Sequence, residues 1–370
     1  MLNHNPPRNN FTENGKENNC SDSMLQNLLQ DSSRTFAFTL EKLPQPLSKW
    51  LRAAYLGARI IDEVEDSPLA VDDKKHIMKR IPSIFRGAGE FEVSSLESML
   101  RGLSEEKIQG YQKLISNISC VKSELGKFPA TIQDIIRKYY DEMTEGLASR
   151  ATQYIQTLED HHRYCHYAAG TIGYMVTELT QEVGYFTVQQ VRTKLMPFPD
   201  NWKLGVNPAH DFALGLQLTN DIRDLHKDVK EGIYRYPQDL LNQESLTYEK
   251  LLNTKEEDKE NLEKAYKILK PQIEDAKQYI LSANTWLDEL PFSPIGLRQA
   301  WGDTLAMSAA TLRTINTPAF FYNEEYRKIS QEEVKCIDEK TRELTEKNKT
   351  MLPFLEHLFN DPVSKYDVDV

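Results

Sequence analysis

Apolar residues recur at steps of three and four along most of the chain, and this periodicity constrains the fold more than any other feature. It is clearest in LSKWLRAAYLGARIIDEVED (47–66), IQDIIRKYYDEMTEGLASRATQYIQ (132–156) and NLEKAYKILKPQIEDAKQYILSANTWL (261–287). This spacing places apolar side chains on one face of an α-helix. Alternation of Val, Ile and Thr with hairpin turns is scarce. The sequence therefore predicts an all-α protein.

Short Pro- and Gly-containing segments punctuate the helical pattern and predict interhelical loops. Examples are RGAGEFE (86–92), MPFPDNWKLGVNPAH (196–210) and ELPFSPIGL (289–297). None resembles a long flexible linker, so we expect one helical domain over residues 23–340. Residues 1–22 are rich in Asn and have little to bury, which predicts a disordered tail. Residues 341–370 are expected to form a C-terminal helix and tail.

Composition excludes some classes of function. The chain has 56 acidic and 45 basic residues, a net charge of -11, which argues against nucleic-acid binding. The four cysteines, Cys20, Cys120, Cys165 and Cys336, contain no CxxC pair and predict neither a zinc site nor a disulfide framework. A reducing cytoplasm fits this usage. No signal peptide or membrane span is indicated, so any membrane contact is expected to be peripheral.

A stripe of acidic side chains runs through QLTNDIRDLHKD (217–228). At about 100° per residue, Asp221, Asp224 and Asp228 fall within about 40° of Gln217 on a helix. Like charges at this spacing repel by roughly a few tenths of a kcal/mol per pair. Basic neighbours on a solvated face are the simplest compensation. The apolar stretch DFALGLQLTN (211–220) favours a buried helix instead, where carboxylates bind divalent cations such as Mg²⁺.

A second stretch, YLGARIIDEVED (55–66), repeats the spacing of the first. Its ridge residues follow at steps of 4, 3 and 4 and are Tyr55, Arg59, Asp62 and Asp66. Each helix thus presents a ridge that ends in a DxxxD pair, and two such ridges can face each other across a cavity in a bundle. With Arg59 and Arg223 nearby, the pattern predicts a diphosphate bound through magnesium.

The remaining metal-ligand residue types do not predict a further metal site. His161 and His162 are adjacent and cannot share a helix face, His166 lacks an obvious third ligand, and His226 adds none. Cys165 lies between aromatic residues, and we interpret it as a buried packing residue.

Several separate segments resemble the squalene and phytoene synthase family, the head-to-head prenyl transferases. SSRTF (32–36) is similar to the family's opening motif, and YLGARIIDEVED to its first aspartate-rich motif. YCHYAAGTIG (164–173) resembles its central Tyr and small-residue helix. LQLTNDIRDLHKD (216–228) resembles the second aspartate-rich motif and YRYPQDLL (234–241) the stretch after it. The segments occur in the family's order.

The resemblance implies a single isoprenoid synthase bundle with a central active-site cavity. It assigns magnesium binding, against two prenyl diphosphates, to Asp62, Asp66, Asp224 and Asp228. It assigns catalytic roles to Arg59, Arg223 and Tyr55: the two arginines would assist the departing diphosphate, and Tyr55 would line the diphosphate end of the cavity. The residues expected to bind substrate are Ser33, Thr35, Phe36, Gln217 and Asn220. Tyr167 occupies the position of the family's catalytic tyrosine, although a core tyrosine would look the same.

The sequence departs from the family pattern in three places. Asp221 stands where the family usually has an aliphatic residue, and it can either extend the metal site or pair with a nearby Arg. The family's Gly-Arg pair is missing from KEGIYRYP, where Ile233 follows Gly232 and Arg235 comes two residues later. Near the C-terminus, Ser330 stands where the squalene synthases would have an Arg for NADPH. Lys328 is the expected contact for NADPH, and use of NADPH stays open.

By resemblance, the expected reaction is a magnesium-dependent 1'-1 condensation of two farnesyl diphosphates through presqualene diphosphate to squalene or dehydrosqualene. One alternative is a phytoene synthase that uses geranylgeranyl diphosphate. Another is a class I terpene cyclase, because NDIRDLHKD (220–228) approximates the cyclase motif NDxxSxxxE. A third is a catalytically silent assembly factor. We expect a cytoplasmic monomer whose only membrane contact is peripheral, for product release.

Overall fold

The computed structural model describes residues 20–67, 69–85, 113–150, 155–185, 204–205 and 207–363. Helices are the regular elements of these residues and no strand occurs among them, which confirms the all-α prediction. The first helices are α1 (Asp22–Ser32), α2 (Arg34–Leu40), α3 (Leu47–Asp66), α4 (Val71–Phe85), α7 (Ile118–Leu125), α8 (Ala130–Arg150), α9 (Leu158–Cys165), the π-helix η1 (His166–Gly170) and α10 (Thr171–Glu182). The later helices are α12 (Pro208–Arg223), α13 (Leu225–Lys230), α14 (Gln238–Gln243), α15 (Tyr248–Asn253), α16 (Lys259–Glu289), α17 (Ile295–Ile315), the 3₁₀ turns η2 (Pro318–Phe321) and η3 (Glu324–Arg327), α18 (Gln331–Glu346) and α19 (Leu352–Leu358).

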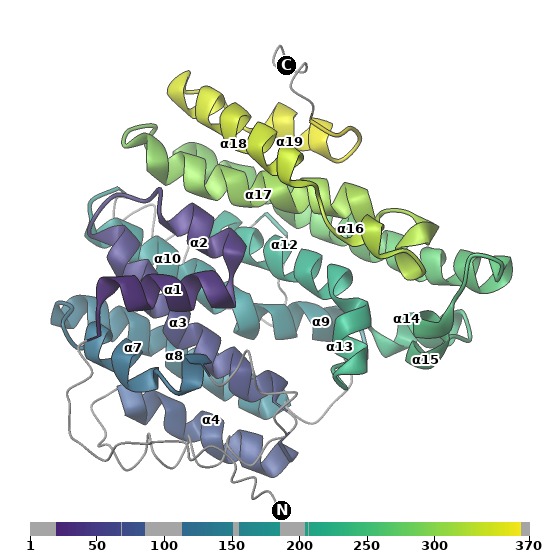
Figure 1. The fold of residues 1–370 in the computed structure, drawn as a ribbon, viewed down its shortest axis with the longest axis horizontal. Coiled ribbons are helices and arrows are strands. Elements are labelled where there is room, and N and C mark those ends of the chain that lie inside the picture. The colour runs from purple at the N-terminus through teal and green to yellow at the C-terminus, as the bar shows by residue number, and fades with distance from the viewer. Residues whose placement is uncertain are drawn as a thin grey trace, which may run out of the picture.

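The helices stack in layers around α12 (Figure 1). On one side α12 packs against α16 and α17, which α18 and α19 cover in turn. On the other side it packs against α10 and η1, beyond which lie α3, α8 and finally α4. The short helices α14 and α15 project at the edge of the molecule. This arrangement puts α3 and α12, which carry the two acidic ridges, in the interior.

Helix α12 forms the centre because apolar residues cover most of its surface outside the acidic stripe. Its start is fixed by Asn207, whose side chain accepts a hydrogen bond from the backbone N–H of His210, and by Pro208 in the first turn. Most of its residues from Ala209 to Ile222 are buried. A helix that is apolar over most of its surface is stable only when other helices cover it.

Small residues let α10 approach α12 closely. A Cβ atom added at Gly173 would lie 2.7 Å from the backbone oxygen of Ala209 and 2.9 Å from the Cβ of Ala213. Any larger side chain at this position would push the two helices apart. Part of the small-residue pattern in 164–173 therefore serves helix packing.

Two expectations from the sequence need correction. The acidic stripe does not lie on one regular helix, because α12 ends at Arg223 and α13 begins at Leu225. Backbone hydrogen bonds still cross the break, from Asp224 to Asn220 at 2.8 Å and from Asp228 to Asp224 at 2.9 Å, so the stripe survives. The expectation of no disulfide was wrong as well: Cys20 is bonded to Cys120, 100 residues away, because folding places the start of α1 beside α7.

Several predicted segments fall on parts of the chain that the structure does not describe. These are residues 1–19 of the N-terminal tail, the RGAGEFE loop (86–92), most of 196–206 and residues 364–370. Within the described residues, every helix is too short or too polar to cross a membrane.

Candidate active site

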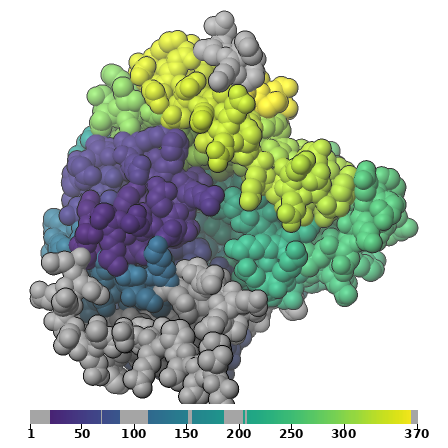
Figure 2. Space-filling model, viewed as in Figure 1, coloured from purple at the N-terminus to yellow at the C-terminus, as the bar shows by residue number. Residues whose placement is uncertain are grey.

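A cavity of 620 Å³ lies between α1 and α2, α3, α12 and α13, and α17. In Figure 2 the surface is recessed where the purple N-terminal helices meet the teal segment of α12 and α13. Every site residue predicted from the sequence except Tyr167 lines this cavity: Ser33, Thr35, Phe36, Tyr55, Arg59, Asp62, Asp66, Gln217, Asn220, Arg223, Asp224, Asp228 and Lys328. The two ridges therefore face one space.

The α3 ridge is held by its own arginine. Arg59 contacts Glu63 at 2.8 Å and Asp62 at 3.6 Å through its two terminal nitrogens. Burial raises the pKa of Asp62 to about 7, although Arg59 opposes the change. One turn earlier, the Tyr55 ring lies 4.7 Å from that of Phe36 on α2. The ridge thus presents carboxylates at one end and aromatic faces at the other.

The α2 side of the cavity depends on a helix cap. Ser33 ends α1 and caps α2, where its hydroxyl accepts a hydrogen bond from the backbone N–H of Phe36 at 3.3 Å. The cap turns the chain sharply, so that Ser33, Thr35 and Phe36 reach the cavity together.

The second ridge pairs its carboxylates with two different arginines. Arg223 donates two hydrogen bonds to Asp224, at 2.8 and 2.6 Å. Asp228 accepts a hydrogen bond from Arg235 at 2.8 Å, and burial raises the pKa of Asp228 to about 7. Of these two arginines, only Arg223 was predicted from the sequence to belong to the site.

Arg235 joins the two ridges at their ends. Its guanidinium donates to Asp66 at 2.6 Å and to Asp228 at 2.8 Å, and it lies 3.4 Å from Glu65. Burial alone would raise the pKa of Asp66, but Arg235, the hydrogen bond with Glu65 and the charge of Arg59 together lower it. For Glu65, burial and the neighbouring Asp66 raise the pKa well above its usual value. Sequence reasoning missed Glu65 and gave Arg235 no role, and the only signal was the displaced arginine in KEGIYRYP.

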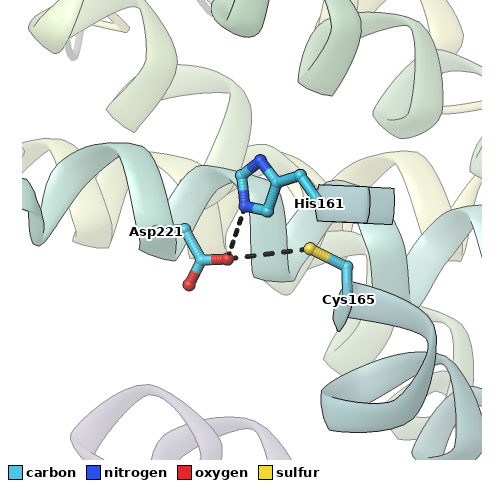
Figure 3. Close-up of side chains that lie close together, drawn as sticks. All are labelled: His161, Cys165 and Asp221. Atoms are coloured by element: carbon cyan, nitrogen blue, oxygen red, sulfur yellow. Dashed lines mark hydrogen bonds and ion pairs between the residues drawn. The ribbon is translucent and has the colours of Figure 1, made fainter. Parts of the chain in front are cut away.

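Asp221 is a buried carboxylate that accepts hydrogen bonds on both of its oxygens. Its Oδ2 accepts hydrogen bonds from His161 Nε2 at 2.9 Å and from the Cys165 thiol at 3.6 Å (Figure 3). Its Oδ1 accepts one from Gln217 at 2.8 Å and lies 3.7 Å from Nε of Arg235. The ligand atoms of His161, Cys165 and Asp221 lie within 4.8 Å of one another, as a metal site would require. Because both oxygens already accept hydrogen bonds, these neighbours account for the carboxylate without a metal. Cys165 is therefore more than the packing residue we expected.

A second cavity, of 640 Å³, adjoins the first. Glu65, Tyr164 and Arg235 line both cavities and so form the wall between them. Tyr167 lines the second cavity, from the π-helix η1. Its ring occupies the space above Gly146 and lies 4.9 Å from the ring of His166. The structure thus sets the predicted catalytic tyrosine behind the Arg235 wall.

Comparison with known proteins gives the family. The family described as squalene/phytoene synthase matches residues 29–332. The chain belongs to the squalene/phytoene synthase family. This match covers both acidic ridges, the π-helix and the Arg235 segment.

Individual members of the family are distant relatives. A squalene synthase of Gibberella zeae is 29% identical over 238 residues, which are 62% of this chain and 46% of the relative. The squalene synthase of Rattus norvegicus is 25% identical over 285 residues, 76% of this chain and 62% of the relative. A 15-cis-phytoene synthase of Enterobacter agglomerans is 32% identical over 174 residues, 46% and 49% of the two chains. The chain thus spans about half the length of the curated relatives it matches.

Solved structures share the fold at low identity. TcSQS in complex with the ligand BPH1237 has a TM-score of 0.70 and 20% identity, and the match covers 92% of this chain and 97% of that one. A dehydrosqualene synthase has a TM-score of 0.58 at 14% identity, with 88% and 96% covered. The all-α isoprenoid synthase architecture expected from the sequence is confirmed.

Proposed function

We propose that this protein is a magnesium-dependent transferase that condenses two farnesyl diphosphates 1'-1 into a C30 hydrocarbon. The observation that carries the proposal is that both DxxxD pairs, with Arg59 and Arg223, line one cavity. The squalene synthases of Gibberella zeae and Rattus norvegicus align with 62% and 76% of this chain, against 46% for the phytoene synthase. This difference favours a C30 product over a C40 product.

The chemistry of the ridges fits magnesium. Mg²⁺ prefers carboxylate oxygens and is commonly held by a few of them together with substrate phosphates. Asp66 and Asp228 belong to different ridges yet contact one guanidinium, so the ridges converge closely enough to share ions. Asp62, Asp66, Asp224 and Asp228 would hold magnesium, which when bound supplies positive charge to the leaving diphosphate.

The chain's own side chains supply the remaining needs of an ionisation reaction. Arg59 and Arg223 carry N–H donors into the cavity and would bind the departing diphosphate. The neighbouring rings of Phe36 and Tyr55, tilted by 34° to each other, offer faces that stabilise a carbocation. Leu216 and Met307 give the lining apolar surface, which helps exclude water as a competing nucleophile.

The product depends on a reductant. Arg34, Arg327 and Lys328 line the same cavity and add positive charge to its surface. Such a surface suits the phosphates of NADPH. We therefore extend the proposal to NADPH as the hydride donor that gives squalene. In its absence the reaction would end by proton loss, as dehydrosqualene.

The first test is to incubate the purified protein with Mg²⁺ and farnesyl diphosphate, with and without NADPH, and to analyse extracted lipids by mass spectrometry. A C30 hydrocarbon is expected, which should be squalene when NADPH is present and dehydrosqualene when it is absent. Product only from geranylgeranyl diphosphate would replace the C30 assignment by phytoene synthesis. A cyclic product from a single substrate would overturn head-to-head condensation, and absence of any product would point to a non-catalytic member.

The acidic ridges give the sharpest mutational test. D62A and D224A should each lower turnover by about a hundredfold or more, because each removes a carboxylate from the proposed metal site. D134A, which alters an exposed carboxylate on α8, is the matched control and should keep full turnover. Circular dichroism should show unchanged helix content in all three variants. Full turnover by D62A and D224A would refute the site.

A further inference from the structure

Arg235 is held in place by the loop that follows α13. Ile233 donates a backbone hydrogen bond to the oxygen of Asp228 at 2.8 Å, and Gln238 donates one to that of Ile155 at 2.8 Å. Between them, the fully packed Tyr236 ring and the hydroxyl of Tyr248, which donates to the Tyr236 oxygen, fix the backbone beside the arginine. The Arg235 side chain is only 11% exposed. The surrounding protein therefore fixes the position of the guanidinium, and solvent has little access to it.

Four carboxylates surround this one guanidinium: Glu65, Asp66, Asp221 and Asp228. Carboxylates grouped in a poorly solvated space repel one another unless a cation lies among them. In the protein without bound metal, Arg235 is that cation. Two departures from the family pattern, the extra Asp221 and the displaced Arg235, are therefore partners in one cluster.

We propose that Arg235 is a resident counter-cation that competes with magnesium for Asp66 and Asp228. When the metal binds, the Arg235 guanidinium leaves these two carboxylates and moves toward Asp221 and Glu65. The inference rests on the proposed magnesium site. Arg235 uses oxygens of the same two carboxylates that would bind the ion, so it must give up those hydrogen bonds. Asp221 lies outside both DxxxD pairs and keeps a carboxylate oxygen 3.7 Å from Nε, so the released guanidinium keeps a partner.

Release of Arg235 also alters the wall between the cavities. The wall consists of Glu65, Tyr164 and Arg235, and the Tyr164 hydroxyl accepts a hydrogen bond from Arg235 at 2.9 Å. Movement of the guanidinium away from Asp66 and Asp228 would rearrange this wall, which separates the 620 Å³ cavity from the 640 Å³ cavity that Tyr167 lines.

The test measures metal binding directly, without turnover. Mn²⁺ replaces Mg²⁺ as the probe, and free Mn²⁺ is followed by electron paramagnetic resonance in titrations of the full-length protein. R235Q should bind Mn²⁺ about tenfold more tightly than the wild type, because the competing charge is gone. Its melting temperature without metal should fall, and Mg²⁺ should raise that temperature more than in the wild type. R163Q removes an arginine that lines the second cavity and pairs with Glu159, and it should match the wild type.

A double-mutant cycle separates the role of Asp221 from that of a metal ligand. D221N should weaken Mn²⁺ binding in the wild type, where Arg235 loses its alternative partner, and should have no effect in R235Q. If R235Q does not fold, R235K retains the charge but cannot bridge Asp66 and Asp228 with a planar fork, and it should bind Mn²⁺ severalfold more tightly than the wild type.

The outcomes distinguish this inference from the function on which it rests. If the wild type binds Mn²⁺ and R235Q or R235K binds it equally or more weakly, the competition is refuted while the magnesium site stands. If D221N weakens binding equally in both backgrounds, Asp221 is a ligand and the release step is refuted. If the wild type binds no Mn²⁺, the magnesium site fails and the inference fails with it.

Discussion

Among single residues, Gly146 lies directly against the ring of Tyr167, the predicted catalytic tyrosine. A Cβ atom there would lie 2.0 Å from Cδ1 and 2.1 Å from Cγ of the Tyr167 ring. G146A must therefore displace that ring. We expect turnover to fall about tenfold or more, while stability falls by about 1 to 2 kcal/mol, because overpacking outweighs the helix propensity that alanine adds.

Gly126 is the matched control for this change. It ends α7 in the right-handed helical region, and an added Cβ would lie 3.5 Å from its nearest neighbour, the Lys122 oxygen. G126A should keep wild-type turnover and melting temperature. Steady-state kinetics and thermal unfolding measure both effects, and normal turnover by G146A would remove Tyr167 from the reaction.

The spacing of single residues also explains which site residues could be predicted from the sequence. Asp62, Asp66, Asp224 and Asp228 follow from helical spacing, because residues three and four apart share a face whatever the tertiary structure. The partners of Asp221 do not follow from spacing: His161 and Cys165 are about 60 positions away and reach it only because α9 crosses α12. The role of Arg235 depends likewise on how one loop returns to the bundle.

At the scale of elements, Lys42 ties three helices together. It follows α2, and its ammonium contacts Asp303 on α17 and Asp338 on α18. Asp303 is almost fully buried, and burial raises its pKa to about 6 although Lys42 opposes the change. K42M should lower the free energy of unfolding by about 3 kcal/mol, because it leaves a buried carboxylate without its cation.

The double variant K42M/D303N identifies the cause. Asparagine carries no charge and can still accept the hydrogen bond from Thr341, so the double variant should regain part of the stability lost in K42M. Urea denaturation gives both values. If the double variant is no more stable than K42M, the loss comes instead from the ion pair with Asp338 or from the cation–π contact with the Phe38 ring.

Element boundaries were the part of the fold that sequence patterns described least well. The apolar period continues unbroken through 217–228, yet the helix stops at Arg223 and restarts at Leu225. Likewise nothing in YCHYAAGTIG distinguishes the π-helix η1 (His166–Gly170) from a regular α-helix. Both irregularities adjoin the site, and π-turns often occur at functional sites. Local periodicity records which face is buried and not how the backbone adapts to its neighbours.

For the whole molecule, the periodicity predicted an all-α protein and the family resemblance predicted the bundle, but neither predicted the covalent ties. The burial of the helix that contains residues 211–220 follows from its largely apolar sequence. The bond between Cys20 and Cys120 does not, because it depends on two segments 100 residues apart meeting at one end of the bundle. Long-range pairings of this kind carry no period in the sequence.

Stability of the whole molecule should depend on pH through His226, which links α13 to η2. Its Nε2–H donates to the backbone oxygen of Phe321 at 2.9 Å, and burial, aided by Arg327, lowers the pKa of the ring to about 4 from 6.5. Between these values the unfolded chain binds more protons on this ring than the folded protein does. The free energy of unfolding therefore rises with pH across this window, and the contribution is lost as pH falls through it. At about 1.36 kcal/mol per pKa unit, the full contribution is about 3 kcal/mol.

H226Q tests this dependence because an amide can keep the hydrogen bond to Phe321 but does not titrate. From pH 7 to pH 4.5, urea denaturation should show the free energy of unfolding falling about 2 kcal/mol less in H226Q than in the wild type. Buried acids such as Asp303 titrate in both proteins and cancel in the difference. H76Q, at an exposed position on α4, is the control and should follow the wild type. Equal losses in H226Q and the wild type would mean that the folded protein accommodates the protonated ring, and that acid opens the molecule elsewhere.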